Sequence, residues 1–244
     1  MKPHILFVTD ANYVSLAKDC IRTFGATNPE YDGTVVAIDV TDAQAKELRA
    51  SSVGFKSFDV KKDTLGGVGS PDGVTSNKKN YAAACRPWHI AALFEHRTPP
   101  AAILYFDVDY EFYDSIAGLV EDGQLADWMI RSCITIDKAD ATPDELKRGW
   151  IQKNGTVESD EWRGVGKLDL NSGLVWVKNT ALNRDVIIPE WCKYIERGNW
   201  AWFTDQHGLR DVLQQHLDEI AWRPVDRKHY PAFKHFKGPS KKKN

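Results

Sequence analysis

Short apolar runs alternate with segments of helical spacing through the first 110 residues, and this order constrains the fold more than any other feature of the chain. The strand-like runs cover residues 5–8, 34–40, 55–60 and 103–106, and the helix-like segments cover residues 14–24, 43–49 and 81–96. Strands and helices that alternate in this way form a mostly parallel sheet with helices on both faces. The sequence therefore predicts an α/β fold.

The remaining segments are less regular. Residues 65–80 contain four glycines and one proline, which predicts a long loop. Further along the chain we expect a polar insertion at 137–167, a turn and strand within 169–178, and helices at 188–195 and 208–217.

Composition narrows the class of protein. With 244 residues, of which 42% are hydrophobic and 27% are charged, the chain can bury a sizeable core, and we expect one domain over residues 1–244. The formal net charge of -2 excludes a general attraction to nucleic acid. Four widely spaced cysteines predict reduced side chains rather than a zinc site or a disulfide framework. The apolar run 4–8 is too short for a signal peptide or a membrane span, so we expect a cytoplasmic protein without an integral membrane segment.

Two aspartates directly follow the apolar run 101–106, at the predicted carboxyl end of a buried strand, where α/β proteins bind ligands. Alternate residues of an extended segment point to the same side, so Asp107 and Asp109 converge on one cation while Val108 faces the other way. A divalent metal prefers such oxygen ligands, and one with open positions also holds a diphosphate. The alternative is a strand that ends in a solvated acidic turn, and the motif alone does not decide between them.

Four motifs that span nearly the whole chain occur in the order found in one known family. They are VTDANYV at 8–14, ILYFDVD at 103–109, LNSGLVWVK at 170–178 followed by TDQ at 204–206, and HFKGPSK at 235–241. The sequence resembles nucleotide-sugar glycosyltransferases of the GT-A fold, and most closely the glycogenin and bacterial lipopolysaccharide galactosyltransferase type. The resemblance implies a Rossmann-like sheet in a single domain with an acceptor-side insertion. It also implies transfer of a hexose from a UDP-sugar to an acceptor hydroxyl, with retention of anomeric configuration.

The same resemblance divides the chain into a nucleotide-binding half, 1–110, and an acceptor-side half, 111–244, that ends in a diphosphate-binding tail. It implies Mn²⁺ or Mg²⁺ as the cofactor, bound by Asp107, Asp109 and His235. The ordinary alternative for His235 is an exposed histidine in a basic tail. An imidazole ligand favours Mn²⁺ over Mg²⁺.

Donor-binding residues carried over from the resemblance are Thr9, Asp10, Tyr13, Arg86, Asp107, Val108, Ser172, Gly238 and Lys241. Among them, Tyr13 is available to stack on the uracil, Arg86 is directed at the diphosphate or sugar, and Lys241 adds positive charge at the leaving diphosphate. The alternatives are a helix cap at Asp10, a packed tyrosine, and a surface salt bridge at Arg86.

The catalytic residues that the resemblance implies are Asp205, Gln206, Asn171 and Lys241. Asp205 and Gln206 match the pair that reaches the reacting face of the sugar, and Asp205 is the first candidate nucleophile if a covalent intermediate forms. A helix cap is the alternative role of Asp205, and both roles are compatible.

Other functions remain open at this point. A sugar nucleotidyltransferase is one, although VTDANYV lacks the Gly-rich phosphate loop of such enzymes. A noncatalytic nucleotide- or sugar-binding protein is another, because nine tryptophans offer stacking surfaces. The acceptor hydroxyl belongs to a glycan, to a protein or, as a minority hypothesis, to a modified base in DNA, which the basic and aromatic C-terminal segment suggests.

Overall fold

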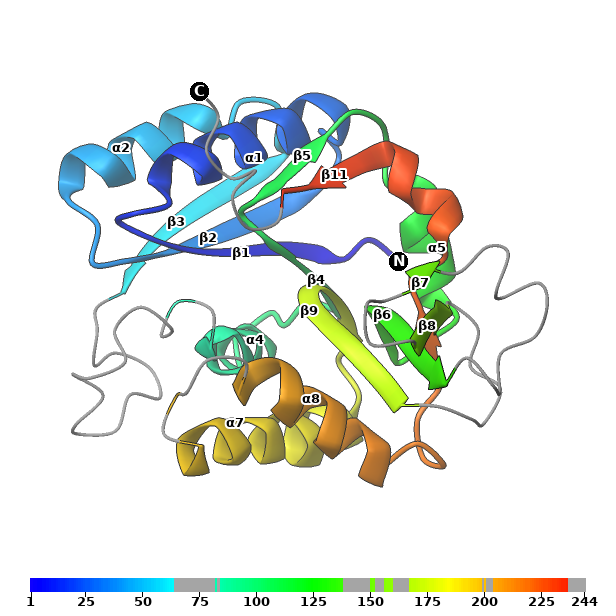
Figure 1. Cartoon of the computed structure of the whole chain (residues 1–244). Coiled ribbons are helices and arrows are strands. Elements are labelled where there is room, and N and C mark those ends of the chain that lie inside the picture. The colour runs from blue at the N-terminus through cyan, green and yellow to red at the C-terminus, as the bar shows by residue number, and fades with distance from the viewer. Residues whose placement is uncertain are drawn as a thin grey trace.

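The computed structural model describes residues 1–63, 82, 84–137, 150–151, 156–159, 167–198, 200 and 204–236. Within these ranges nine strands form one sheet in the order β3-β2-β1-β4-β9-β6-β8-β7, with β10 paired to β6 (Figure 1). The strands are β1 (His4–Asp10), β2 (Asp32–Ile38), β3 (Ser57–Asp63), β4 (Ala102–Asp107), β6 (Trp128–Asp137), β7 (Trp150–Ile151), β8 (Thr156–Ser159), β9 (Lys167–Lys178) and β10 (Trp222–Pro224).

Most pairings are parallel among the seven central strands of the sheet, which are β3, β2, β1, β4, β9, β6 and β10. Strands β3, β2, β1 and β4 run parallel to one another, and β10 runs parallel to β6. Strand β9 is antiparallel to both β4 and β6, and it joins the two parallel parts. The predicted α/β class, with a mostly parallel sheet, is confirmed.

Helices cover both faces of this sheet, as Figure 1 shows. Helices α1 (Val14–Thr27), α2 (Asp42–Ser51) and α5 (Ala117–Gln124) pack on one hydrophobic cluster, and α4 (Arg86–Phe94), α7 (Ile188–Arg197) and α8 (Thr204–Gln215) pack on the other. Helix α1, predicted over residues 14–24, buries Val14, Ala17, Cys20, Ile21 and Phe24, which recur at helical spacing. Thr41 forms a capping box with Gln44 at the start of α2.

A second, two-stranded sheet fixes the C-terminal segment beside the end of β4. Strand β11 (Phe233–His235), which follows the 3₁₀ helix η3 (Arg227–Ala232), is antiparallel to β5 (Tyr110–Phe112). The ring of Phe233 packs against Phe106 and Tyr110, and the Phe236 amide donates to the Asp109 carbonyl over 2.8 Å. Aromatic packing thus holds this segment in place, because burying each such ring contributes several kcal/mol, roughly 3–5 on truncation.

Other sequence predictions fall partly outside the described residues. The predicted loop 65–80 lies wholly outside them, and of the predicted insertion 137–167 only Asp137, β7, β8 and Lys167 are described. Within the part of the chain that the structure describes, Cys20, Cys85 and Cys192 are free cysteines. Among the described residues, no helix combines the length and the apolar composition that a membrane crossing requires.

Candidate functional site

Three potential metal ligands converge at the carboxyl end of β4. The ligand atoms of Asp107, Asp109 and His235 all lie within 4.8 Å of one another. Asp107 ends β4, Asp109 sits in the turn before β5, and β11 places His235 opposite Tyr110. The Nε2 atom of His235 is 3.0 Å from Oδ1 of Asp109. Two carboxylates and one imidazole form a donor set that suits a divalent cation such as Mn²⁺.

Contacts on its far side fix the ring of His235. Arg131 of β6 donates from Nη1 to His235 Nδ1 over 2.8 Å and to the Tyr110 hydroxyl over 3.2 Å. The rings of Tyr110 and His235 stack at 4.4 Å and 3°. The guanidinium of Arg131 also lies over the ring of Tyr230, 5.1 Å from its centre. The sequence analysis did not predict a role for Arg131, because no local motif marks this residue. Its partner His235 reaches it only through the pairing of β11 with β5.

Arg86 lies at the centre of a buried ion cluster at the start of α4. Its side chain is 3% exposed, and Nη2 is 3.2 Å from Asp205 Oδ2 and 3.6 Å from Asp107 Oδ1. Nη1 donates to the Ser172 carbonyl, and the guanidinium stacks over Tyr105, whose hydroxyl donates to Asp107 Oδ1 over 2.6 Å. Burial by itself lowers the pKa of Arg86, but Tyr105, Asp205 and Asp107 together hold that pKa above its ordinary value. Arg86 therefore stays charged and orients both carboxylates.

Strand β9 carries the Asn171-Ser172-Gly173 motif. The pairing of β9 with β4 places this motif directly beside Asp107. The Ser172 hydroxyl donates to Asp205 Oδ2 over 2.8 Å, and Asn171 Oδ1 accepts from the Gly173 amide over 3.1 Å. A Cβ atom at Gly173 would lie 2.6 Å from Asp107 Oδ2, so only glycine leaves the carboxylate its room.

Asp205 and Gln206 occupy the first turn of α8. The Asp205 carbonyl accepts from Trp191 Nε1 over 2.7 Å, which fixes the backbone at this point. The side chain of Asp205, 8% exposed, directs its carboxylate at Arg86 and Ser172. Gln206 is half-buried beside it. The structure thus joins the TDQ motif to the β9 motif, although 30 or more residues separate them in the sequence.

The residues at the end of β1 lie at the same edge of the sheet, because Val8 is in register with Asp107. Thr9 is buried, Asp10 accepts from the Asn12 amide over 2.7 Å, and Tyr13 is 40% exposed. Val108 is buried in the hydrophobic cluster on which α1 packs. Predicted residues Gly238 and Lys241 lie outside the described residues.

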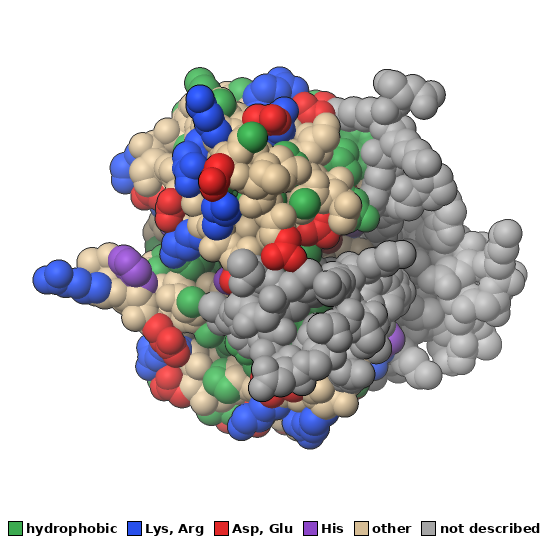
Figure 2. All heavy atoms as spheres, turned by 90° about the vertical axis from the view of Figure 1, so that its left-hand side faces the viewer, with side chains coloured by type: hydrophobic (Ala, Val, Ile, Leu, Met, Phe, Trp, Pro, Cys, Tyr) green, Lys and Arg blue, Asp and Glu red, His purple; other side chains and the backbone are tan. Residues whose placement is uncertain are grey.

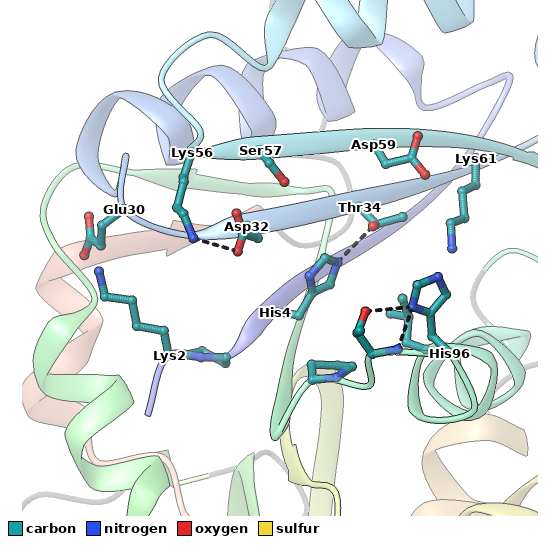
Figure 3. A pocket seen from close by; sticks show the side chains of 14 residues that line it. Lys2, His4, Glu30, Asp32, Thr34, Lys56, Ser57, Asp59, Lys61 and His96 are labelled. Carbon is teal, nitrogen blue, oxygen red and sulfur yellow. Dashed lines mark hydrogen bonds and ion pairs between the residues drawn. The ribbon is translucent and has the colours of Figure 1, made fainter.

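A separate pocket of about 460 Å³ lies at the opposite end of the parallel strands (Figure 3). It is lined at the starts of β1 to β3 by charged and polar side chains, with an ion pair between Lys56 and Asp32 at 3.4 Å. His4 Nε2 lies 2.9 Å from the Thr34 hydroxyl in its wall. None of the predicted site residues lines this pocket.

Comparison with solved structures gives matches over almost the whole chain. The glycosyltransferase GlyE of Streptococcus pneumoniae TIGR4 has a TM-score of 0.54 at 14% identity and covers 94% of this chain, which spans about half (46%) of GlyE. The galactosyltransferase LgtC, solved with donor and acceptor sugar analogs, has a TM-score of 0.53 at 17% identity, with 97% of this chain and 87% of LgtC covered. Mouse xyloside xylosyltransferase 1 has a TM-score of 0.53 at 12% identity, with 93% and 85% covered.

Sequence comparison alone finds neither a matching protein-family model nor a matching curated protein. At these low identities the structural likeness establishes the architecture of the chain. This chain has the GT-A fold that those glycosyltransferases share.

Proposed function

We propose that the protein is a metal-dependent glycosyltransferase that moves a hexose from a UDP-sugar to an acceptor hydroxyl with retention of configuration. The observation that carries this proposal is the convergence of Asp107, Asp109 and His235 at the carboxyl end of β4, within a GT-A fold. A pair of carboxylates and an imidazole at that edge of the sheet suits a metal that also holds a diphosphate. The likeness to LgtC, a galactosyltransferase solved in complex with donor and acceptor sugar analogs, supports the same reaction class.

In this proposal the three ligands hold Mn²⁺ or Mg²⁺, which when bound supplies positive charge to the departing diphosphate. Thr9, Asp10 and Tyr13 bind the nucleoside at the end of β1. Arg86 orients Asp107 towards the ligand cluster and Asp205 towards the sugar, because it contacts both carboxylates. Gly238 and Lys241 contact the diphosphate, as their motif predicts.

Asp205 faces the reacting sugar in this arrangement, together with Gln206 and Asn171. A carboxylate held by Arg86 and Ser172 has a fixed direction, which suits stabilisation of an oxocarbenium-like centre. A covalent adduct on Asp205 would be detected by mass spectrometry of the enzyme after incubation with the donor. Full activity of Asp205→Ala would exclude both roles.

The acceptor belongs to a glycan or a protein in our proposal, and the 137–167 insertion contacts it. Acidic and basic side chains are interspersed over the described part of the face in Figure 2, and that surface gives no footprint for a polyanion such as DNA. The division into halves 1–110 and 111–244 and the cytoplasmic location stay predictions.

Release of UDP from a panel of UDP-hexoses tests the function directly. We expect release that requires Mn²⁺ or Mg²⁺, stops in chelator and returns when the metal is restored. A sugar nucleotidyltransferase would instead form pyrophosphate or a nucleotide sugar, and a binding protein would release no UDP at all. Activity that persists in chelator would contradict the metal-dependent mechanism.

Gly173→Ala is expected to weaken Mn²⁺ binding by about tenfold or more while thermal stability changes little. The added Cβ would lie 2.6 Å from Asp107 Oδ2, so the carboxylate must turn away, whereas the backbone of β9 keeps its place. Calorimetric titration of Mn²⁺ and a thermal melt measure the two effects. Ala91→Gly in α4 is a control that changes one methyl group away from the carboxylates. Unchanged Mn²⁺ affinity in Gly173→Ala would show that Asp107 is not a ligand.

A further inference from the structure

The hydrogen bond between Arg131 and His235 constrains where the histidine proton lies. A guanidinium has donors and no acceptor, so His235 Nδ1 must accept when Arg131 Nη1 approaches it at 2.8 Å. A neutral imidazole carries one proton, and in this arrangement that proton is on Nε2. Nε2 is the atom that faces Asp109, 3.0 Å away.

Metal ligation by Nε2 requires the other tautomer. A ligating nitrogen has no proton, and the second ring nitrogen then donates its own proton to a carboxylate, a carbonyl or water. Arg131 cannot accept that proton, so its contact with Nδ1 and ligation by Nε2 exclude each other. The structure thus places a donor where a ligating histidine needs an acceptor.

We propose that Arg131 is a latch: it holds His235 in the non-ligating tautomer and releases it when the diphosphate of a donor takes the guanidinium. This inference rests on the metal role that we propose for His235. Arg131 is suited to the exchange because its planar fork matches phosphate oxygens. Its other contacts within the described part of the chain, with the Tyr110 hydroxyl and with the side chain of Tyr230, are to neutral groups.

The consequence is coupled binding of metal and nucleotide. Without a diphosphate, the metal must break a charge-assisted hydrogen bond before His235 can ligate, which weakens binding by about ten- to a hundredfold. When a diphosphate is present, Arg131 binds the diphosphate instead of His235, and all three metal ligands are available. The two ligands therefore strengthen each other through one side chain, in addition to their direct contact.

Substitutions of Arg131 distinguish the proposed latch from an effect of the Arg131 charge alone. Arg131→Gln and Arg131→Met both remove one positive charge, but only the glutamine amide oxygen accepts from Nδ1–H and supports the ligating tautomer. Arg131→Lys keeps both the charge and a donor. Arg223→Gln is the matched control, since Arg223 lies on β10 next to β6 and contacts the Asp122 carbonyl instead of His235.

The experiment is calorimetric titration of Mn²⁺ with and without UDP, at one pH where free histidine is neutral. Without UDP we expect Arg131→Gln to bind Mn²⁺ about tenfold more tightly than the wild type, Arg131→Met to lie between them, and Arg131→Lys and Arg223→Gln to match the wild type. The gain in Mn²⁺ affinity that UDP produces should shrink in Arg131→Gln. Nitrogen NMR of the wild-type protein should show His235 protonated at Nε2.

Three results overturn the latch: equal Mn²⁺ affinity in Arg131→Gln and the wild type, weaker binding in Arg131→Gln, or a wild-type His235 protonated at Nδ1. The NMR measurement needs no substitution, so it decides even if a variant fails to fold. His235→Ala distinguishes the two proposals. If its Mn²⁺ affinity equals that of the wild type with UDP present, the proposed metal role of His235 fails first; if it loses affinity while the Arg131 variants do not change, only the latch fails.

Discussion

Asp107→Asn and Asp109→Asn are each expected to lower kcat for UDP release by about a thousandfold, or roughly 4 kcal/mol of transition-state stabilisation. Each change removes one of two carboxylates from the three-residue cluster while keeping the volume of the side chain. Asp109 is 4% exposed beside His235, so solvent cannot compensate for the loss of its negative charge. Initial rates over a range of Mn²⁺ concentrations measure the effect.

Glu111→Gln provides the matched control, because it removes one carboxylate charge two residues beyond Asp109 and outside the cluster. It should keep near wild-type activity. Circular dichroism and a thermal melt should show all three variants folded. If Asp107→Asn and Asp109→Asn retain full activity at low Mn²⁺, the cluster at the end of β4 does not bind the catalytic metal.

Replacing Arg86 with methionine is expected to lower the free energy of unfolding by about 3–5 kcal/mol and to abolish activity. The guanidinium is 3% exposed and contacts both Asp205 and Asp107, so its loss leaves carboxylates without their compensating charge. It also removes the donor to the Ser172 carbonyl. Urea denaturation measures the free energy of unfolding. For a chain of this size, the expected loss corresponds to a decrease in Tm of roughly 10 °C.

A second substitution tests the cause of that loss. In Arg86→Met with Asp205→Asn, one stranded charge is neutralised, so we expect part of the stability to return while activity stays absent. Arg86→Lys keeps the charge but loses the planar fork that reaches two partners, and we expect an intermediate loss. Additive losses in the double variant would show that Arg86 and Asp205 are not energetically coupled.

Local patterns in the sequence sufficed for much of the fold and for the carboxylates. Apolar runs and helical spacing depend on neighbouring residues, which is why β1, β4 and α1 lie close to their predicted places. Strand β3 starts later than predicted because Phe55 leaves the sheet edge and stacks on Phe24 at 5.2 Å. The predicted turn at 169 is part of β9, since residues 167–171 pair with β6 beyond a register shift at Ile130 and Arg131.

Contacts between segments that are distant in the sequence could not be predicted from such local patterns. The resemblance named His235, but the pairing of β11 with β5 is what sets its distance from Asp109. Arg131 carries no motif, and its importance follows only from the ring that tertiary packing brings to it. The links from Arg86 to Ser172 and Asp205 likewise join three motifs through a buried network that no spacing along the chain encodes.

The pairing of β11 with β5 makes the candidate site a late product of protein synthesis. A nascent chain carries both aspartates long before it carries the histidine, and it acquires the full ligand set only after residue 235 has left the ribosome. Any cation that then binds the three groups favours the docked strand over the detached one by mass action. Occupancy of the site would therefore hold β11 against β5, so that metal depletion would expose the C-terminal strand to proteases before the central sheet opens.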